Sequence, residues 1–501
     1  MEKKKPWIIT AAIVASVQLL VQVLTLIFVL RLNMLPTEYI VVLILGMVLL
    51  LEATAMLMFI PVKDRIRLWR KIVSCVLAAA IMAGCVFASR FAWKTYHFVD
   101  EISGGNFIAT KAIRVLVLNE SPAQKLADTK GCTYGVMPDY DAEHTQQMVT
   151  AVKTETGGSA SFTNYQQITA MVDALYNGQL DALILHDASI SLLVEQDGYQ
   201  DFMSRARILH TLTIEEKVEV NVQPPREDLP KSCFIIYISG SDTRSKILDV
   251  SRSDVNILAV VNPNTKQILL VNTPRDYYIP HPNSKNGSMD KLTHCGNSGV
   301  GCSIKALETL YDAKIDYYAQ INFTGFEKLV DAIGGITVYS DQSFYTVEGG
   351  SYIQKGENQL NGEKALQFAR ERYNLRGGDN DRGKNQMKII KAIVEKLTSS
   401  SALITNYADI LKSLEKMFVT NFHMEEISDL VKMQLSDMAT WDVQSYAVTG
   451  KGSSEWCYSW SDYQLSVTIP DQATVDYAQT LIDRVLAGQK LTAEDVILPK
   501  E

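Results

Sequence analysis

Three long apolar stretches at the start of the chain constrain its fold more than any other feature. They span Trp7–Leu30, Tyr39–Pro61 and Ile72–Trp93, and each has 22 to 24 residues. A helix of that length, at about 1.5 Å per residue, crosses the roughly 30 Å of a bilayer's hydrocarbon core. One such stretch is compatible with a cleaved signal peptide, but three in succession predict an anchor of three transmembrane helices.

Basic residues in the connecting loops predict the orientation of this anchor. Three lysines precede the first stretch and five basic residues lie between the second and third, whereas the first loop has only Arg31 against Glu38. Loops rich in Lys and Arg stay in the cytoplasm. The N-terminus and second loop are therefore predicted to be cytoplasmic, and everything after about Lys94 to lie outside the cell membrane.

The charge balance of the outer part excludes one class of partner. Residues 1–94 hold 11 basic and 4 acidic residues, which leaves 37 basic and 52 acidic residues beyond them, a net charge of −15. General nucleic-acid binding needs a basic footprint. The predicted cytoplasmic pieces are also too short for a DNA-binding module. We therefore expect no nucleic-acid partner.

The outer part is predicted to hold two α/β domains. Strand and helix patterns alternate from Lys111 to about Glu215, which indicates a small accessory domain. It weakly resembles half of a periplasmic-binding-protein lobe, and a structural or partner-docking module is the favoured interpretation. Residues 221–230 contain three prolines and predict a linker. We divide the chain into a membrane anchor (1–94), an accessory domain (95–220), a catalytic domain (221–450) and a C-terminal extension (451–501).

Apolar runs predict a central sheet flanked by helices in the second α/β domain. The predicted strands include Phe234–Ile238, Val255–Val261 and Gln267–Asn272. The longest predicted helix is Lys384–Leu397. Residues 449–470 are aromatic-rich and are expected to form a loop, before a terminal amphipathic helix at 474–486.

Seven cysteines divide between the two sides of the predicted membrane boundary. Cys75 and Cys85 lie within the third apolar stretch, and the other five lie beyond it, where disulfides persist. Cys295 and Cys302 are close enough to close a small loop, which predicts a disulfide, with two free thiols as the alternative. His294 beside Cys295 also suggests a metal, but the spacing is not that of a zinc site.

Charged residues gather at the ends of three successive predicted strands. Asp242 follows the first strand in a glycine-containing turn, Arg252 and Asp254 begin the second, and Arg275 and Asp276 follow the third. Ligands of α/β sheets bind at such ends. Two carboxylates brought together repel unless a cation lies between them, and Mg²⁺ is the usual oxygen-binding candidate. Taken alone, each segment favours an ordinary turn with a surface Arg–Asp pair.

A second group of arginines lies more than ninety residues further along. Arg370 and Arg372 are two positions apart and are not on one helical face, so a helix is expected to end there. Arg382 and Gln386 are four apart and are expected to point the same way from the next helix. Guanidinium groups bind phosphate oxygens bidentately, so this break suits a phosphate, with a solvated charged loop as the alternative.

The joint order of these segments is more specific than any one of them. The segments Ser239–Arg244, Ser251–Asp254, Pro274–Asp276 and Phe368–Gln386 together resemble the LytR-CpsA-Psr family of bacterial envelope enzymes. Further matching segments are Lys291–His294, Ile315–Tyr318, Asp331–Ile336 and Gly356–Ala365. The resemblance covers roughly residues 230–450. The three-span anchor and the accessory domain are similar to those of the capsule-associated members.

The resemblance implies a function for the chain. Members transfer a glycopolymer from an undecaprenyl-pyrophosphate carrier to peptidoglycan, outside the cell membrane of Gram-positive bacteria. It implies Mg²⁺ as cofactor, the lipid bilayer as a partner, and an apolar tunnel for the polyprenyl tail between the sheet and its covering helices. The polymer, whether capsular polysaccharide, teichoic acid or another wall polysaccharide, is left open by the sequence.

The same resemblance implies roles for individual residues. Asp242 and Asp254 match magnesium-binding aspartates. The positions expected to hold the pyrophosphate are Arg252, Arg275, Arg370, Arg372 and Gln386. Asp379 and Arg382 match the charged pair that follows, and either Asp276 or Asp379 is expected to accept the proton of the attacking hydroxyl. The glycine-rich stretch between Cys295 and Cys302 departs from the family, whose members are often aromatic-rich there.

Two other functions compete with transfer. A hydrolase would use the same residues on the lipid pyrophosphate, with water as acceptor. A non-enzymatic envelope sensor or assembly scaffold is suggested by the accessory domain. Free polymer as the product would indicate hydrolysis, and polymer bound to peptidoglycan would indicate transfer.

Overall fold

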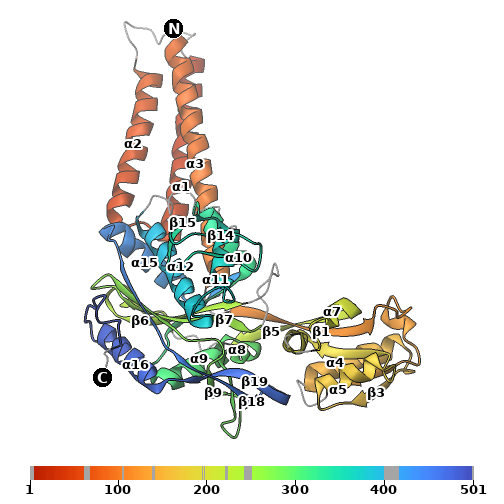
Figure 1. The fold of residues 1–501 in the computed structure, drawn as a ribbon. Helices are drawn as coiled ribbons and strands as arrows, with labels where there is room; N and C mark the ends of the chain where they lie inside the picture. The colour runs from red at the N-terminus through yellow and green to blue at the C-terminus, as the bar shows by residue number, and fades with distance from the viewer. Residues whose placement is uncertain are drawn as a thin grey trace.

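The chain forms a long helical anchor followed by two α/β units (Figure 1). The computed structural model describes residues 5–60, 68–103, 106–137, 142–194, 196, 198–219, 224–241, 251–399, 414 and 417–498. Helices and mixed sheets alternate after the anchor, which confirms the predicted α/β class with an N-terminal membrane segment.

The anchor consists of α1 (Lys5–Leu32), α2 (Thr37–Phe59) and α3 (Leu68–Ile102). All three are long and apolar enough to cross a membrane. Polar side chains tie them together: Gln22 Nε2 donates to the carbonyl of Met47 (3.1 Å), and Thr25 Oγ1 to that of Cys85 (3.2 Å). At 35 residues, α3 exceeds the span of a hydrocarbon core, which takes about 20 residues. The helix therefore continues past residue 94, the predicted end of the anchor, to Ile102.

The first α/β unit is built on a five-stranded sheet of order β3-β2-β4-β1-β5. Its strands are β1 (Asn106–Leu118), β2 (Thr133–Val136), β3 (Ser161–Asn164), β4 (Ala182–His186) and β5 (Ala206–Glu219). Its helices are α4 (Ala142–Glu155), α5 (Ile168–Tyr176), α6 (Asp187–Leu193) and α7 (Phe202–Arg205). The alternation predicted for this region is present. The long β1 and β5 pair antiparallel and carry this unit away from the rest of the molecule (Figure 1).

The second unit is built on a six-stranded mixed sheet of order β16-β11-β6-β7-β8-β17. Its strands are β6 (Phe234–Ser241), β7 (Ser253–Asn262), β8 (Gln267–Asn272), β11 (Tyr317–Asn322), β16 (Phe418–Thr420) and β17 (Asp442–Ala447). The three strands predicted from apolar runs are β6, β7 and β8. They form a continuous antiparallel meander at the centre of the sheet.

Helices cover both faces of this sheet because successive strand residues point to opposite sides. Ile235 and Tyr237 of β6 pack with α9 (Val300–Tyr311) and α16 (Gln472–Leu486). Ile236 and Ile238 face the other side, which is covered by α10 (Phe323–Ala332), α11 (Gly362–Arg370), α12 (Asp379–Ser399) and α15 (Met424–Asp437). The predicted helix at 384–397 is the main part of α12.

Short strand pairs and turns complete this unit. They are η3 (Leu229–Lys231), β9 (Tyr278–Pro280), β10 (Met289–Lys291), α8 (Leu292–Cys295), η4 (Gly296–Ser298), β12 (Ile336–Ser340), β13 (Phe344–Tyr345), β14 (Tyr352–Ile353) and β15 (Gly356–Leu360). The first unit also contains a short 3-10 helix, η2 (Leu126–Asp128).

The loop expected at residues 449–470 is wrong, because the structure has a hairpin there. Its strands are β18 (Gly450–Cys457) and β19 (Trp460–Pro470). Trp460, Leu465 and Val467 are buried in the core of the five-stranded unit. The hairpin therefore packs its buried side chains between the two units and is not an irregular loop.

The anchor packs directly on the six-stranded unit. Leu32 and Met34, at the end of α1, and Phe98 of α3 belong to the same hydrophobic cluster as Ile333 and Phe344. The base of the anchor is therefore part of the core beneath α10 and α12, as Figure 1 also shows. This contact fixes the height of the larger sheet relative to the spans.

Candidate active site

Charged residues meet where β6 ends and β7 begins. These strands run antiparallel with Gly240 opposite Val255, and Thr273 after β8 donates its N–H to the carbonyl of Asn256 at 2.9 Å. The pairing brings Asp254 on β7 beside Arg275, which follows β8. Asp242 lies outside the described residues.

Arg275 forms the centre of an ion-pair network. Its Nη1 lies 2.7 Å from Asp254 Oδ1, and its Nε lies 3.7 Å from Asp276 Oδ1. The Arg275 side chain is 8% exposed, so these charges interact with little solvent screening. The N–H of Thr293 donates to the Arg275 carbonyl at 2.8 Å and holds the backbone.

Lys291 joins this network, a contact that the sequence did not predict. Its Nζ lies 3.3 Å from Asp276 Oδ1. Lys291 ends β10 and lies in one of the segments that resemble the family. The pairing of β10 with β9 places it against the residue that follows Arg275.

The predicted break between the two arginine-bearing helices is confirmed. Helix α11 ends at Arg370, and Glu371 is extended (φ −63°, ψ 132°), which leaves Arg372 in the loop. Glu371 is buried and accepts backbone N–H groups of Val347 (2.6 Å), Arg372 (3.0 Å) and Asn374 (3.0 Å). Its carboxylate therefore holds the turn that separates the two guanidinium groups.

Arg382 and Gln386 point the same way from α12, as their spacing predicted. Both line one cavity, and Arg382 forms an ion pair with Asp379 at the start of the helix. Gln386 Nε2 donates to the carbonyl of Ala369 at 3.2 Å, which fixes α12 against the end of α11.

Arg370 has two partners that the sequence did not reveal. It forms an ion pair with Glu348, and its guanidinium carbon lies 4.5 Å from the centre of the Phe323 ring. Glu348 lies in the β13–β14 hairpin and Phe323 begins α10. No local pattern relates either residue to Arg370, because only the tertiary fold brings them together.

The three aspartates of the network have different proton affinities. Burial alone raises the pKa of Asp254, but the surrounding guanidinium groups, Arg275 above all, hold it below its ordinary value. Burial also raises the pKa of Asp276, yet Arg275 and Lys291 bring it below its ordinary value. Asp379 differs, because burial raises its pKa beyond what Arg382 offsets.

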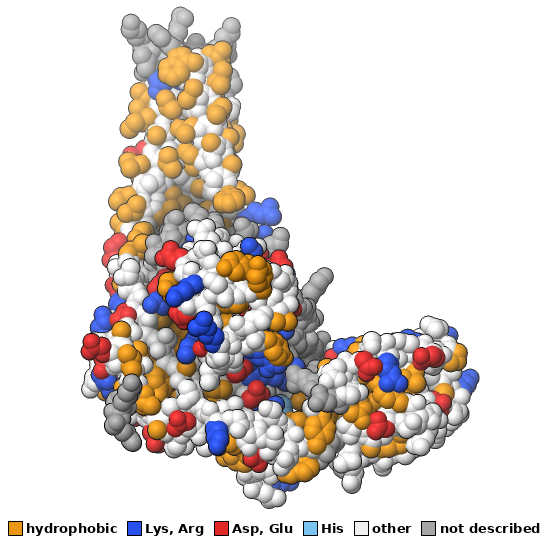
Figure 2. Space-filling view, in the orientation of Figure 1, with side chains coloured by type: hydrophobic (Ala, Val, Ile, Leu, Met, Phe, Trp, Pro, Cys, Tyr) orange, Lys and Arg blue, Asp and Glu red, His pale blue; other side chains and the backbone are white. Residues whose placement is uncertain are grey.

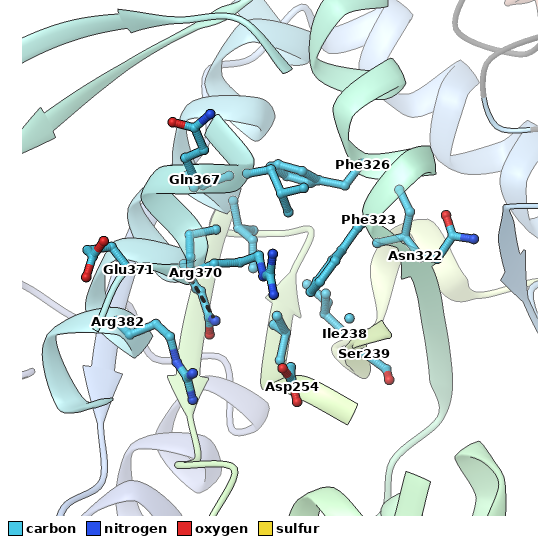
Figure 3. A pocket seen from close by; sticks show the side chains of 18 of the residues that line it. Ile238, Ser239, Asp254, Asn322, Phe323, Phe326, Gln367, Arg370, Glu371 and Arg382 are labelled. Atoms are coloured by element: carbon cyan, nitrogen blue, oxygen red, sulfur yellow. Dashed lines mark hydrogen bonds between the residues drawn. The ribbon is translucent and has the colours of Figure 1, made fainter. Parts of the chain in front are cut away.

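A cavity of about 480 Å³ extends from this network between the sheet and its covering helices. Its charged and polar end is lined by Arg252, Asp254, Arg275, Arg370, Arg372, Arg382 and Gln386. Its apolar wall includes Ile238, Val255, Phe323, Phe326, Leu329, Leu366, Ile389, Ile390, Ile393 and Val394. Figure 3 shows Arg370, Arg382 and Asp254 directed toward a common space, with Phe323 and Phe326 beside it. The structure thus places all five residues predicted to bind pyrophosphate around one cavity.

Asp254 offers a carboxylate oxygen of the kind that a divalent cation binds. Its Oδ1 is buried and, apart from the ion pair with Arg275, makes no hydrogen bond of good geometry within the described residues; the same holds for Oδ1 of Asp276 and Asp379 with their ion pairs. Carboxylate oxygens are the ligands that Mg²⁺ prefers. This donor fits the predicted cation, while its predicted partner Asp242 is not described.

Cys295 and Cys302 come together with His281 in a buried cluster. The two sulfurs and a ring nitrogen all lie within 4.8 Å of one another, with Cys302 Sγ 3.8 Å from His281 Nε2. Both cysteines are present as thiols. The Cys295 thiol first, and His281 second, lower the pKa of Cys302 to about 6, although burial raises it. The disulfide between them stays a prediction.

His294 contacts Asp290 and Ser459 in an arrangement that joins parts of the fold. Asp290 Oδ1 lies 2.6 Å and Ser459 Oγ 2.7 Å from the same ring nitrogen, Nδ1. A hydrolase triad needs the serine and the carboxylate on opposite ring nitrogens. These three residues therefore join β10 and α8 to the turn of the β18–β19 hairpin and are not arranged for nucleophilic catalysis.

These features define a membrane-anchored α/β protein with a cluster of arginines at one end of a largely apolar cavity. The model of the LytR_cpsA_psr family matches residues 199–476, more than half of the chain. The chain belongs to this family, which confirms the resemblance seen in its motifs.

Two curated relatives carry the same name, "Polyisoprenyl-teichoic acid--peptidoglycan teichoic acid transferase TagU". The one from Oceanobacillus iheyensis is 30% identical over 246 residues, which cover 47% of this chain and 74% of the relative. The one from Enterococcus faecalis is 33% identical over 202 residues, 40% of this chain and 65% of the relative. The crystal structure of B. subtilis TagV is 25% identical and covers 52% of this chain and 99% of that chain, with a TM-score of 0.42.

Proposed function

We propose that this protein transfers a glycopolymer from a polyprenyl-pyrophosphate carrier to peptidoglycan at the outer face of the cell membrane. The observation that carries the proposal is the cavity, which holds five arginines at one end and has many apolar side chains along the rest of its wall. A polyprenyl pyrophosphate has the matching form, because a doubly charged anion is attached to a long hydrocarbon chain. The names of the curated relatives support the same class of reaction.

The arginine cluster suits a pyrophosphate for electrostatic reasons. Guanidinium groups bind phosphate oxygens bidentately and keep their charge when buried. Arg252, Arg275 and Arg382 are each less than a tenth exposed. Five arginines line the cavity against three carboxylates, those of Asp254, Glu348 and Glu371. An anion entering the cavity offsets this excess of positive charge.

The anchor supports a substrate that stays in the bilayer. Three helices are long and apolar enough to cross a membrane, and the basic loops predict that the α/β units lie outside. An enzyme held at that surface meets lipid-linked substrates without releasing them into water. The multi-pass, outward-facing topology is part of this proposal.

Mg²⁺ is the proposed cofactor, held by Asp254 and by Asp242. When bound, it supplies positive charge against the pyrophosphate oxygens. The residues of the chain supply the rest: Arg275 and Arg370 orient the anion, and the apolar wall holds the hydrocarbon tail and excludes water.

Asp379 is the proposed proton acceptor, in preference to Asp276. A carboxylate with a raised pKa takes up a proton more readily, and Asp379 is the one of the two whose pKa is raised. The acceptor hydroxyl oxygen bonds to the sugar-linked phosphorus while its proton moves to Asp379. The bond from that phosphorus to the bridging oxygen breaks, and polyprenyl phosphate leaves with the electron pair.

Product analysis of the full chain in lipid nanodiscs tests this proposal. The protein is supplied with a polyprenyl-pyrophosphate-linked glycan, Mg²⁺ and peptidoglycan fragments. We expect glycan attached to peptidoglycan, and on the order of 100-fold less of it with Arg275→Ala or Arg370→Ala. Arg376→Ala is the matched control, because Arg376 is exposed and does not line the cavity.

Two results would contradict transfer. Free glycan in place of attached glycan would mean hydrolysis of the lipid pyrophosphate. Attachment in cells that persists in both arginine variants would mean that the protein acts as a sensor or scaffold.

A further inference from the structure

Four residues at the edge of the cavity expose large apolar side chains. Tyr345 is 62% exposed, Val347 61%, Tyr352 55% and Tyr373 71%. We name this group the tyrosine rim. Two of its members, Val347 and Tyr373, also line the cavity. The rim therefore connects the cavity to the surface of the protein.

The tyrosine rim is held in place by well-defined contacts. The rings of Tyr345 and Tyr352 lie with their centres 4.9 Å apart across the β13–β14 pair. Asn374 Nδ2, from the loop that carries Tyr373, donates to the Tyr345 carbonyl at 2.8 Å. Buried Glu371 accepts the N–H of Val347 at 2.6 Å. The exposed rings are thus presented by a fixed hairpin.

This hairpin lies at the end of the molecule that meets the membrane. Figure 1 places β14 and β15 beside the lower parts of α1 and α3. The inward residues of the hairpin, Phe344 and Ile353, belong to one hydrophobic cluster with Leu32 and Met34 at the end of α1. In Figure 2, hydrophobic side chains gather near this position, just beyond the apolar surface of the helices.

The anchor itself shows where the bilayer surface lies. Tyr39 lies in the first turn of α2. The guanidinium carbon of Arg31, near the end of α1, lies 4.9 Å from the centre of the Tyr96 ring. Tyrosine is enriched at the level of the lipid headgroups, because its ring is apolar and its hydroxyl hydrogen-bonds to water or phosphate. The tyrosine rim has this chemistry at this level.

We propose that the tyrosine rim rests in the headgroup region of the leaflet that receives the ends of α1 and α2. A lipid surface is favoured over other partners because the rim continues the apolar surface of the anchor. Contact with the bilayer turns the edge of the cavity toward the lipid. A polyprenyl chain then passes from the leaflet into the cavity without crossing water, a consequence that rests on the proposed function.

Lipid quenching in nanodiscs tests the contact directly. In the full chain, Cys75→Ala, Cys132→Ser and Cys233→Ser remove the three thiols that are not buried. A fluorophore is attached at Val347→Cys in one sample. The nanodiscs contain phosphatidylglycerol and phosphatidylethanolamine, with or without a lipid that carries a nitroxide near its headgroup.

The matched control carries the fluorophore at Ser454→Cys. Ser454 is exposed on β18, at the end of the molecule far from the anchor (Figure 1). We expect the nitroxide lipid to quench the label at 347 several-fold more strongly than the label at 454. Tyr373→Cys offers a second rim position should the first variant not fold.

Equal and weak quenching at both positions would overturn the proposal. A second overturning result is weak quenching at 347 in nanodiscs that hold several copies of the chain, with stronger quenching in nanodiscs that hold one. That result would mean that a second copy covers the rim when it is present. Weak quenching together with a change of the 347 label on adding muropeptide would assign the rim to glycan. The measurement needs no carrier and no turnover, so its failure leaves the transfer proposal standing, and a failed transfer assay leaves the contact standing.

Discussion

Arg275 Nη1 lies 2.7 Å from Asp254 Oδ1, although Asp254 is on β7, Arg275 follows β8, and the two residues are 21 positions apart in the chain. Both side chains are mostly buried, at 8% and 15% exposure. The pair is therefore poorly screened by solvent, and each charge depends on the other. Around this contact the rest of the cluster is arranged.

Asp254→Asn is expected to reduce transfer by on the order of 100-fold, and to weaken its dependence on Mg²⁺, because the variant loses an anionic oxygen ligand. Transfer rates across a Mg²⁺ titration check this. A wild-type Mg²⁺ dependence in the variant would contradict the assignment of Asp254 to the cation.

The same substitution makes a separate prediction for stability. The pKa of Asp254 is lower in the folded protein, so its contribution is present above the unfolded-state pKa and is lost as pH falls through the folded-state value. Asp254→Asn should therefore be less stable than wild type at neutral pH, and the difference should shrink in acid. Thermal unfolding at several pH values measures it.

Asp379 is expected to control the acidic limb of the pH–rate profile. Its pKa is raised, and the proposed proton acceptor works only when deprotonated, so the rate should fall as pH drops through that value. Asp379→Asn should be slow at every pH and lose that limb. The Asp379→Asn variant should be at least as stable as wild type at neutral pH. A carboxyl whose pKa is raised in the folded state destabilises that state when it is charged, and the substitution removes this charge. An unchanged acidic limb in a variant that still turns over would exclude this role.

Glu348→Gln is expected to lower the KM for the carrier. Glu348 pairs with Arg370 in the absence of substrate and competes with a pyrophosphate for the same guanidinium group. Both side chains are more than a third exposed, so the pair contributes only roughly 0–1 kcal/mol to stability. Steady-state kinetics, with thermal unfolding as the control, would show a lower KM at unchanged stability. A higher KM would mean that Glu348 orients Arg370 for binding.

Ile393→Trp is expected to block the far end of the cavity. Ile393 lies eleven residues after Arg382 on α12, which is about 16 Å along a helix. The larger side chain should raise the KM for a long polyprenyl carrier and leave a short-chain analogue nearly unaffected, since the short tail does not reach this point. The ratio of the two KM values is the measurement. An equal effect on both carriers would show that the tail does not follow α12.

Cys295 and Cys302 are expected to be joined when the protein is isolated without reductant. The lowered pKa of Cys302 gives it thiolate character at neutral pH, and the loop that closes is short. Intact mass after alkylation counts the thiols that remain. Reduction should cost roughly 2–3 kcal/mol of stability. Full alkylation of both residues would mean free thiols, and stoichiometric zinc would mean that His281 completes a metal site.

The helices and strands of this protein are largely readable from local patterns. The spans, the strands β6, β7 and β8, and the helix break after Arg370 all follow from periodicity and spacing, whereas the antiparallel pairing of the three strands comes from the structure. The β18–β19 hairpin does not, because Trp460, Leu465 and Val467 are buried against the five-stranded unit, a contact that no local pattern reveals. The contacts of Lys291 with Asp276, and of Glu348 and Phe323 with Arg370, also escape local patterns, because the tertiary fold brings these residues together.

The sequence by itself determined the membrane anchor, the α/β class, the family and the identity of most charged residues in the cluster. Each of these depends on composition, or on residues close together in the chain. The tertiary structure alone decided that Arg370 faces Glu348, that the apolar wall encloses a cavity, and that the tyrosine rim lies beside the spans. A cavity and a solid core have the same composition, so only the packing of distant segments distinguishes them.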